Sequence, residues 1–323
     1  MSQDVRALWI TAPLHAELAR APLDAKPGHL VIETLFTGIS RGTERLVFQG
    51  RVPESEHETM RAPFQEGNFS FPVKYGYSAV GRVSVGPQAG QVIFALSPHQ
   101  TRFCCPPDAA VPLPDAVPPE RAVLAANMET ALNIMWDARV LPGDRVAVVG
   151  AGTVGALVGY LAARVPGTDV CLIDVDEGRA DLAARFGCRF ATSDRAVGGA
   201  DADVVIHASA SEAGLGTALA LAGCEATVIE ASWYGAGRTS VALGGVFHQR
   251  RLRLVASQVG RIPASHAARW TYRRRLETAL RLLSDPVLDA LISGECRFED
   301  LPRDYAAILD APGTLCHRVR YGG

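Results

Sequence analysis

The pattern of apolar and polar positions begins with a β-rich part. Short apolar runs between glycines and prolines predict strands at 29–38, 78–86 and 91–96. No segment in the first hundred residues has the length and periodicity typical of a helix. The mixed polar stretch 51–74 predicts a long ordered loop or a short helix, and long loops in compact domains often carry function. The proline-rich stretch 106–120 predicts an extended segment that closes this part.

From residue 121 onward, the pattern alternates between helical and strand-like segments. The predicted helices are 122–138, 153–164, 178–187 and 218–223, and the predicted strands are 145–150, 169–174, 203–209, 225–232 and 251–258. This alternation predicts βαβ units, and hence an α/β fold with a doubly wound parallel sheet covered on both faces. A basic helix at 269–283 and a return of β character at 314–321 follow.

Composition narrows the class of protein. A length of 323 residues predicts two domains. Hydrophobic residues make up 48% and charged residues 20% of the chain, which excludes a disordered protein. The formal net charge of −2 gives no general attraction for polyanions, so neither nucleic acid nor an acidic membrane is an expected partner.

Cysteine usage and the N-terminus indicate the compartment. The seven cysteines are scattered, odd in number and without a C-x-x-C pair, so neither a disulfide framework nor a zinc knuckle is predicted. The N-terminus has no sustained apolar run, so no signal peptide is readable. The uncharged stretch 146–163 nears the length of a membrane span, but its glycines divide it into a strand and a helix. We therefore expect a cytoplasmic protein with reduced thiols.

The strongest local motif lies between a predicted strand and a predicted helix. It has the G-x-G-x-x-G spacing and the structural context of a dinucleotide-binding turn. The three glycines permit the tight turn, the approach of a pyrophosphate and the packing of the helix, whose N-terminus attracts phosphate. We therefore predict a cofactor site formed by Gly150, Gly152, Thr153, Val154 and Gly155. The alternative is a glycine-rich turn without a ligand.

Asp174 indicates which nicotinamide cofactor is bound. It ends the second predicted strand, 22 residues after Gly152, close to the offset of about 20 expected for an acid that binds the adenosine ribose. A carboxylate there accepts from the 2′-hydroxyl and repels a 2′-phosphate, which favours NAD(H) over NADP(H). The alternative is that Asp174 caps the next helix, although Asp176 is better placed for that role. The nearby Arg179 keeps open the binding of a 2′-phosphate.

Two further residues follow strand ends at the expected cofactor crevice. His207 ends one predicted strand and Ser232 ends the next, and ligands of parallel sheets bind beyond the carboxyl ends of strands. We interpret both as cofactor-binding residues. Alternatively, His207 is a hydrogen-bonded strand-end histidine, and Ser232 belongs to an aromatic segment, Trp233-Tyr234, that packs at a domain junction.

Four segments resemble the medium-chain dehydrogenase/reductase superfamily of the zinc alcohol dehydrogenase type. They are TGISRGTE (37–44), YGYSAVGRV (75–83), LPGDRVAVVGAGTVG (141–155) and VFHQRRLRLVASQVG (246–260). The resemblance implies a GroES-like β-barrel domain formed by 1–120 and 265–323, with a Rossmann domain at 121–264 between them. The motifs GIS-x-GTE and GY-x-x-VGRV are also similar to a branch that contains bacteriochlorophyllide dehydrogenases.

The chain departs from this resemblance at the catalytic zinc ligands. Ser40 lies where the family has a cysteine, and Tyr77-Ser78 lie where it has His-Glu. The third ligand position falls at Ala126 or Asn127, and the four-cysteine structural lobe is missing. Zinc is bound by cysteine, histidine or carboxylate, so we expect no zinc.

The resemblance implies an oxidoreductase that moves a hydride between a nicotinamide and an alcohol or carbonyl substrate. The missing zinc ligands and Asp174 make the expected enzyme zinc-independent and NAD(H)-dependent. Tyr77 is the predicted oxyanion donor or general acid, and Thr43 matches the proton-relay residue of the family. The predicted substrate-binding residues are Ser40, Arg41 and Glu44, with Glu44 also interpreted as a structural acid. The resemblance places the substrate in the interdomain cleft and implies a homodimer.

Two other interpretations stay open. One is a nucleotide-binding protein without turnover, a regulatory or redox-sensing relative that has kept the fold and lost the metal, because a fold does not establish an activity. The other is a metalloenzyme with unconventional ligands.

Overall fold

The computed structural model describes residues 5–20, 22–23, 25–86, 88–196 and 201–322. The chain forms two compact units, of which unit 1 comprises Met1–Ala126 and Leu276–Gly323, and unit 2 comprises Asn127–Arg275. The divisions between them lie inside helices α3 (Ala125–Ala138) and α9 (Tyr272–Leu282), whereas the sequence placed them after residues 120 and 264. Within the described ranges, no helix is long and apolar enough to cross a membrane.

Unit 1 is built on two sheets. A seven-stranded sheet has the order β16-β17-β3-β6-β7-β9, with β8 paired to β3, and a four-stranded sheet has the order β2-β1-β5-β4. The strands of unit 1 are β1 (Arg6–Ala12), β2 (His15–Arg20), β3 (Leu30–Ser40), β4 (Glu66–Gly67), β5 (Val73–Lys74), β6 (Ala79–Val85), β7 (Val92–Ala95), β8 (Arg102–Cys105), β9 (Val111–Pro112), β16 (Ile292–Arg297) and β17 (Cys316–Arg320). Its helices are α1 (Arg41–Phe48), α2 (Pro119–Ala122) and α10 (Leu301–Asp310), with short 3-10 segments at Glu54–Glu56, Pro286–Leu291 and Phe298–Asp300.

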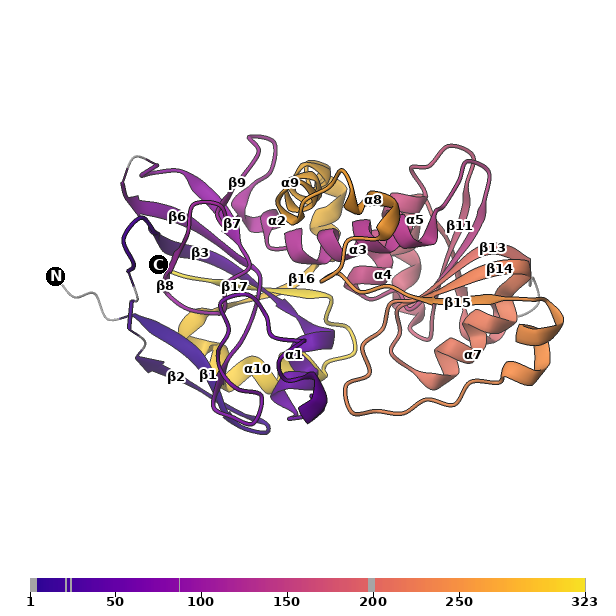
Figure 1. The fold of residues 1–323 in the computed structure, drawn as a ribbon, viewed down its shortest axis with the longest axis horizontal. Helices are drawn as coiled ribbons and strands as arrows, with labels where there is room; N and C mark the ends of the chain where they lie inside the picture. Colours follow the sequence, from indigo (N-terminus) through magenta and orange to yellow (C-terminus); the bar gives the residue numbers. More distant parts are fainter. Residues whose placement is uncertain (1–4, 21, 24, 87, 197–200, 323) are drawn as a thin grey trace. The chain divides into compact units, whose positions relative to one another are not determined.

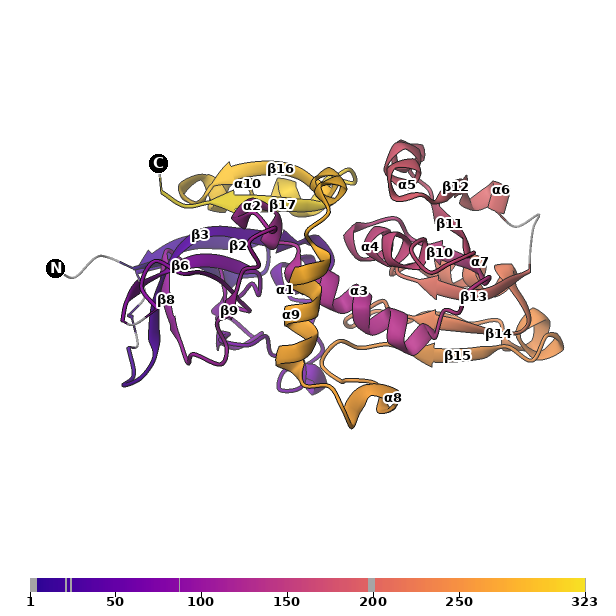
Figure 2. The same cartoon turned by 90° about the horizontal axis from the view of Figure 1, so that it is seen from above.

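Strand β3 joins the two ends of the chain. It pairs antiparallel with β6 and β8 on the N-terminal side and with β17 near the C-terminus, and Cys316 lies opposite Ser40 (Figures 1 and 2). Apolar residues alternate along β3, and two of them, Leu30 and Ile32, are buried in one cluster with Phe103 of β8. The predicted strand in the C-terminal segment is therefore present and belongs to the same sheet as the N-terminal strands.

The absence of a helix from the first hundred residues is a wrong prediction. Helix α1 follows β3 directly and buries Glu44, Val47 and Phe48. Its eight residues make only about two turns. A segment that short does not show enough of the 3.6-residue apolar period for a helix to be distinguished from a loop.

Unit 2 contains a six-stranded parallel sheet with the order β12-β11-β10-β13-β14-β15 (Figure 2). Its strands are β10 (Arg145–Val149), β11 (Asp169–Asp174), β12 (Arg189–Thr192), β13 (Ala202–His207), β14 (Ala222–Glu230) and β15 (Arg253–Ala256). Besides α3 and part of α9, its helices are α4 (Thr153–Ala162), α5 (Ala180–Phe186), α6 (Ser193–Ala196), α7 (Glu212–Leu221) and α8 (Ala264–Ala267), with a 3-10 segment at Glu177–Arg179 and a π segment at Leu243–Phe247.

The sheet of unit 2 brings its functional candidates to one edge. Helix α4 packs on β10 and β11, and α7 packs on β10, β13 and β14 (Figure 2). The strand order reverses between β10 and β13, because β11 and β12 lie on one side of this point and β14 and β15 on the other. Ligands of open parallel sheets bind at such a switch point, beyond the carboxyl ends of the strands.

Candidate functional site

The glycine turn after β10 has the geometry that a phosphate site requires. Gly150 has a φ of +103°, and a Cβ on it would lie 2.7 Å from the backbone nitrogen of Ser209. A Cβ on Gly155 would lie 1.8 Å from the carbonyl oxygen of Gly150, so no side chain fits there. A Cβ on Gly152 would meet no atom within 4 Å. Gly152 precedes α4, whose partly exposed first residues are Thr153 and Val154, so its backbone faces open space at a helix N-terminus.

Asp174 lies beside this turn, at the end of the neighbouring strand. Its Oδ2 accepts a hydrogen bond of 2.7 Å from the backbone N–H of Ala151, and its Oδ1 accepts one of 3.0 Å from that of Asp176. A carboxylate has about four acceptor positions, so Asp174 can accept further hydrogen bonds from a ribose. Asp176 caps the following 3-10 segment by accepting from the backbone N–H of Gly178 at 3.0 Å.

Arg179, in the same segment, forms an ion pair with Asp176. Its Nε lies 3.3 Å from Oδ2 of Asp176, and the residue is largely buried. The arginine that could bind a 2′-phosphate is therefore already paired with a carboxylate.

His207 lies at the carboxyl end of β13 and is fully buried. Its Nδ1 is 2.8 Å from Oε2 of Glu230, and its Nε2 is 2.7 Å from Oγ of Ser209. Ser209 is the residue whose backbone approaches Gly150. His207 therefore links the end of β14 to the loop that borders the glycine turn.

Glu230 ends β14 and collects several donors. Besides His207, it accepts a hydrogen bond of 2.8 Å from the backbone N–H of Ser232 and one of 3.1 Å from the hydroxyl of Tyr234. Burial acts to raise the pKa of Glu230, but the hydrogen bonds from His207 and Ser232 outweigh it, so its pKa is lowered. The hydroxyl of Ser232 accepts a hydrogen bond of 3.1 Å from the backbone N–H of Ala210.

The predicted catalytic residues lie together in unit 1. The hydroxyl of Tyr77 forms hydrogen bonds with the side chains of Ser40 and Thr43 at the junction of β3 and α1. Burial and the carboxylate of Glu44 raise the pKa of Tyr77 to about 12. At neutral pH Tyr77 is therefore protonated, which suits a donor and not a base.

Glu44 supports this junction from a fully buried position. It accepts hydrogen bonds from the backbone N–H of Ser40 at 2.7 Å, from Nε2 of His99 at 3.0 Å and from the hydroxyl of Tyr305 at 2.7 Å. Nδ1 of His99 lies in turn 2.7 Å from the hydroxyl of Thr37. These contacts tie Glu44 to the end of β3 and to α10.

Arg41 is bound at the surface of unit 1. Its Nε donates a hydrogen bond of 2.9 Å to the carbonyl oxygen of Leu309, the penultimate residue of α10. The side chain is partly buried, so one edge of α1 is tied to α10.

Ser40 and Tyr77 lie at two of the positions where the resembled family has zinc ligands. Ser40 and Tyr77 offer hydroxyl groups there, and zinc in proteins is bound by thiolate, imidazole or carboxylate. Across the part of the chain that the structure describes, no three His, Cys, Asp or Glu side chains gather in a way that could hold a metal ion.

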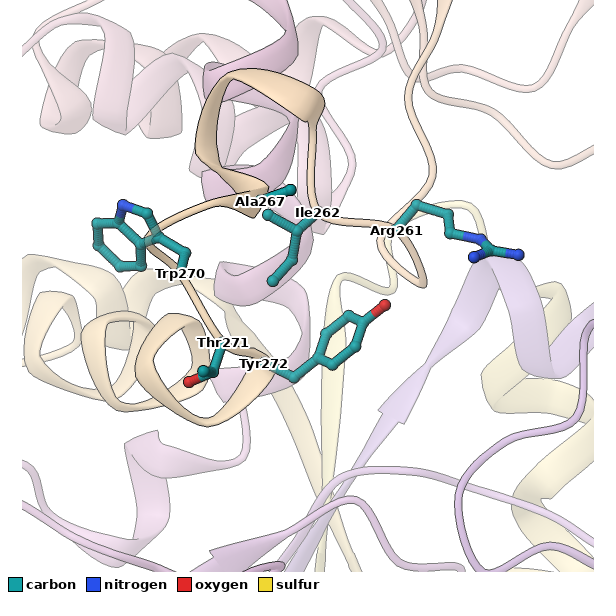
Figure 3. Close-up of a pocket in the computed structure, with 6 residues that line it drawn as sticks. All are labelled: Arg261, Ile262, Ala267, Trp270, Thr271 and Tyr272. Atoms are coloured by element: carbon teal, nitrogen blue, oxygen red, sulfur yellow. The ribbon is translucent and has the colours of Figure 1, made fainter.

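Two surface hollows are lined by residues of unit 2. An open hollow of about 380 Å³ is lined by Arg261, Ile262, Ala267, Trp270, Thr271 and Tyr272 (Figure 3). A second one, of about 220 Å³, is bordered by Arg145 and Asp169, which begin β10 and β11. It lies at the amino end of the sheet, opposite to the edge where such sheets bind ligands. Neither hollow is lined by the glycine turn or Asp174.

No protein-family model matches the sequence. Among curated proteins, it is 27% identical over 203 residues to D-guloside 3-dehydrogenase of Escherichia coli (strain K12), covering 59% of this chain and 58% of the relative. It is 26% identical over 154 residues to D-xylulose reductase A of Aspergillus niger, covering 43% of this chain and 42% of the relative. The chain thus spans about half the length of the curated relatives it matches.

Solved structures match over the whole chain. L-idonate 5-dehydrogenase from Escherichia coli K-12 has a TM-score of 0.81 at 14% identity and covers 99% of both chains. A putative zinc-binding dehydrogenase from Sinorhizobium meliloti 1021, bound to NADP, has a TM-score of 0.78 at 16% identity and covers 99% of this chain and 100% of its own. A protein described as a short chain alcohol dehydrogenase, from Escherichia coli CFT073 and complexed with NADH, has a TM-score of 0.77 at 15% identity and covers 98% of this chain and 99% of its own.

The chain has the fold of the medium-chain dehydrogenases. The fold that the motifs implied is therefore confirmed, and so is the predicted fold class, α/β with a doubly wound parallel-sheet domain and a second, β-rich domain.

Within this medium-chain dehydrogenase fold, the sequence did not indicate all members of the two polar clusters. Glu230 was missed, although a single acid inside the apolar run TVIEAS is a readable signal. His99 and Tyr305 were missed because they meet Glu44 from positions 55 and 261 residues away. A local sequence pattern cannot predict contacts between residues so far apart along the chain.

Proposed function

We propose that this chain is an oxidoreductase that transfers a hydride between NAD(H) and the hydroxyl or carbonyl group of a small polyol-like substrate. The observation that carries the proposal is the glycine turn at 150–155 with the carboxylate of Asp174 bound to it. The names of the relatives support the substrate class, because D-guloside, D-xylulose and L-idonate are all sugars or sugar acids.

The residues present fit a dinucleotide. The open backbone at Gly152 and the start of α4 would hold the pyrophosphate, and Asp174 would accept from the ribose hydroxyls. When bound, the nicotinamide donates or accepts the hydride. The choice of NAD(H) over NADP(H) follows from the negative charge of Asp174 and from the pairing of Arg179 with Asp176.

Tyr77 is the proposed proton donor in carbonyl reduction. Its hydroxyl stays protonated at neutral pH because its pKa is raised to about 12, and Ser40 and Thr43 hold it in place. Glu44 and Arg41 hold the turn that carries Ser40 and Thr43. A hydroxyl donor in this position replaces the charge stabilisation that a metal gives, so we propose that the reaction proceeds without zinc.

A second copy of this chain is the proposed partner. All four residues of β15, at the end of the six-stranded sheet, are exposed, including the apolar Leu254 and Val255. An exposed strand edge with apolar side chains favours pairing with another chain. We therefore propose a homodimer, which light scattering of the purified protein tests directly.

The test of the proposed activity has two stages. Calorimetry first measures binding of NADH and NADPH, and a panel of polyols, ketoses and aldonates is then screened for NADH production or consumption. We expect NADH to bind more tightly than NADPH and at least one substrate to turn over. Tight binding without turnover on any substrate would instead support a nucleotide-binding protein.

A further inference from the structure

Glu230 lies in the half of the sheet that would receive the nicotinamide. The sheet order β11-β10-β13-β14 places Asp174 and Glu230 at the same edge, three strand spacings apart, which is about 14 Å. A dinucleotide lies across the switch point, one half on either side. With its adenosine ribose at Asp174, the other half extends toward the ends of β13 and β14. This placement rests on the proposed function.

The network around Glu230 carries a negative charge. His207, Ser232 and Tyr234 each provide a donor to its carboxylate, and its pKa is lowered, so Glu230 is ionised at neutral pH. These contacts need only one N–H on the ring of His207. With Nδ1 donating to Glu230, Nε2 can accept from the hydroxyl of Ser209, which lies 2.9 Å from that of Ser211. Ser211 accepts from the backbone N–H of Gly214 at 3.0 Å.

The same network borders the glycine turn. A Cβ on Gly150 would collide with the backbone of Ala208 and Ser209, and Ser209 is bonded to the ring of His207. Two residues therefore connect the glycine turn to Glu230: Ser209 contacts Gly150, and His207 contacts both Ser209 and Glu230. The charge lies inside the predicted cofactor crevice and is not a remote surface charge.

We propose that Glu230 sets the relative affinity of the site for the oxidised and the reduced cofactor. The nicotinamide ring of NAD⁺ carries a positive charge and that of NADH carries none, so a fixed carboxylate beside it stabilises only the oxidised form. By linkage, a site that favours NAD⁺ makes the bound reduced cofactor a stronger hydride donor. Glu230 thereby biases the enzyme toward reduction of its carbonyl substrate.

The test compares the dissociation constants of NAD⁺ and NADH for the wild-type protein and Glu230→Gln, by calorimetry and NADH fluorescence. The substitution removes the charge and keeps the size. We expect the ratio Kd(NAD⁺)/Kd(NADH) to rise about tenfold. This change corresponds to about 1.4 kcal/mol, which is within the range for the attraction between two partly buried unit charges. Glu225→Gln is the matched control, since Glu225 lies on the same strand, exposed and paired with Arg251, and should leave the ratio unchanged.

A second variant keeps the proposal testable if Glu230→Gln does not fold. Tyr234→Phe, at a partly exposed position, removes one donor and leaves the charge less compensated, so the ratio should fall about twofold. A rise in Tyr234→Phe, or a change below twofold in folded Glu230→Gln, would overturn the proposal while leaving the proposed function intact. Wild-type protein that binds neither cofactor would overturn both.

Discussion

The carboxylate of Asp174 accepts a hydrogen bond of 2.7 Å from the backbone N–H of Ala151, inside the glycine turn that follows the neighbouring strand. The bond fixes the end of β11 against the start of the β10–α4 turn. It also means that one side chain serves both the turn and the ribose that we propose to bind there.

Replacing this carboxylate therefore has two expected effects. In Asp174→Ala, the NADH dissociation constant should rise about tenfold or more, because a charge-assisted hydrogen bond is lost, while that of NADPH should fall or stay the same. Calorimetry with both cofactors measures the change. Asp181→Asn, an exposed acid on α5, is the control and should alter neither constant. A wild-type protein that binds NADPH more tightly than NADH would contradict this role of Asp174.

Tyr77→Phe should separate chemistry from binding. Loss of the hydroxyl removes the proposed proton donor, so turnover of the carbonyl substrate should fall about 10²-fold while NADH affinity stays within about twofold. Steady-state kinetics and NADH fluorescence measure the two quantities. Tyr272→Phe, which changes an exposed tyrosine, should leave both unchanged. Normal turnover in Tyr77→Phe would exclude this mechanism.

Metal analysis tests the proposed independence from zinc. Because Ser40 and Tyr77 offer only hydroxyl groups at the ligand positions, the purified protein should contain well under one zinc per chain. Turnover should also survive dialysis against a chelator. Stoichiometric zinc, lost together with activity, would show that other ligands bind it.

Stability should fall at alkaline pH. Burial raises the pKa values of Tyr75, Tyr77, Tyr305 and Tyr321 above 10, the value expected in the unfolded chain. The unfolded state therefore releases these protons first, so the stabilisation is complete below about pH 10 and is lost as pH rises toward the folded values. Denaturation midpoints between pH 8 and 11.5 should decline, and less steeply in Tyr77→Phe than in Tyr272→Phe. A midpoint that stays constant over this range would contradict the burial of these hydroxyls.

The glycine turn and the position of Asp174 beside it could be predicted because their signals are local. Gly150, Gly152 and Gly155 are close in sequence, and a parallel sheet brings the end of β11 to the same edge without further information. The cluster of polar side chains around Tyr77 and Glu44 in unit 1 could be predicted only in part. Tyr77 and Thr43 were found by resemblance, but Glu44 meets Tyr305 across 261 residues, and only the folded sheets bring them together. Helix α1 was missed because two turns carry too little periodicity.

The most direct measurement is NADH binding to Gly152→Ala beside the wild-type protein, with Gly155→Ala as the structural comparison. A Cβ at 152 meets no protein atom within 4 Å, whereas one at 155 would lie 1.8 Å from the carbonyl oxygen of Gly150. Gly152→Ala should therefore keep the wild-type melting temperature and lose NADH affinity about tenfold or more, because its methyl group occupies the space of the pyrophosphate. Gly155→Ala should fail to fold stably. If Gly152→Ala is stable and binds NADH as tightly as the wild type, or the wild type binds none, the glycine turn is not a cofactor site.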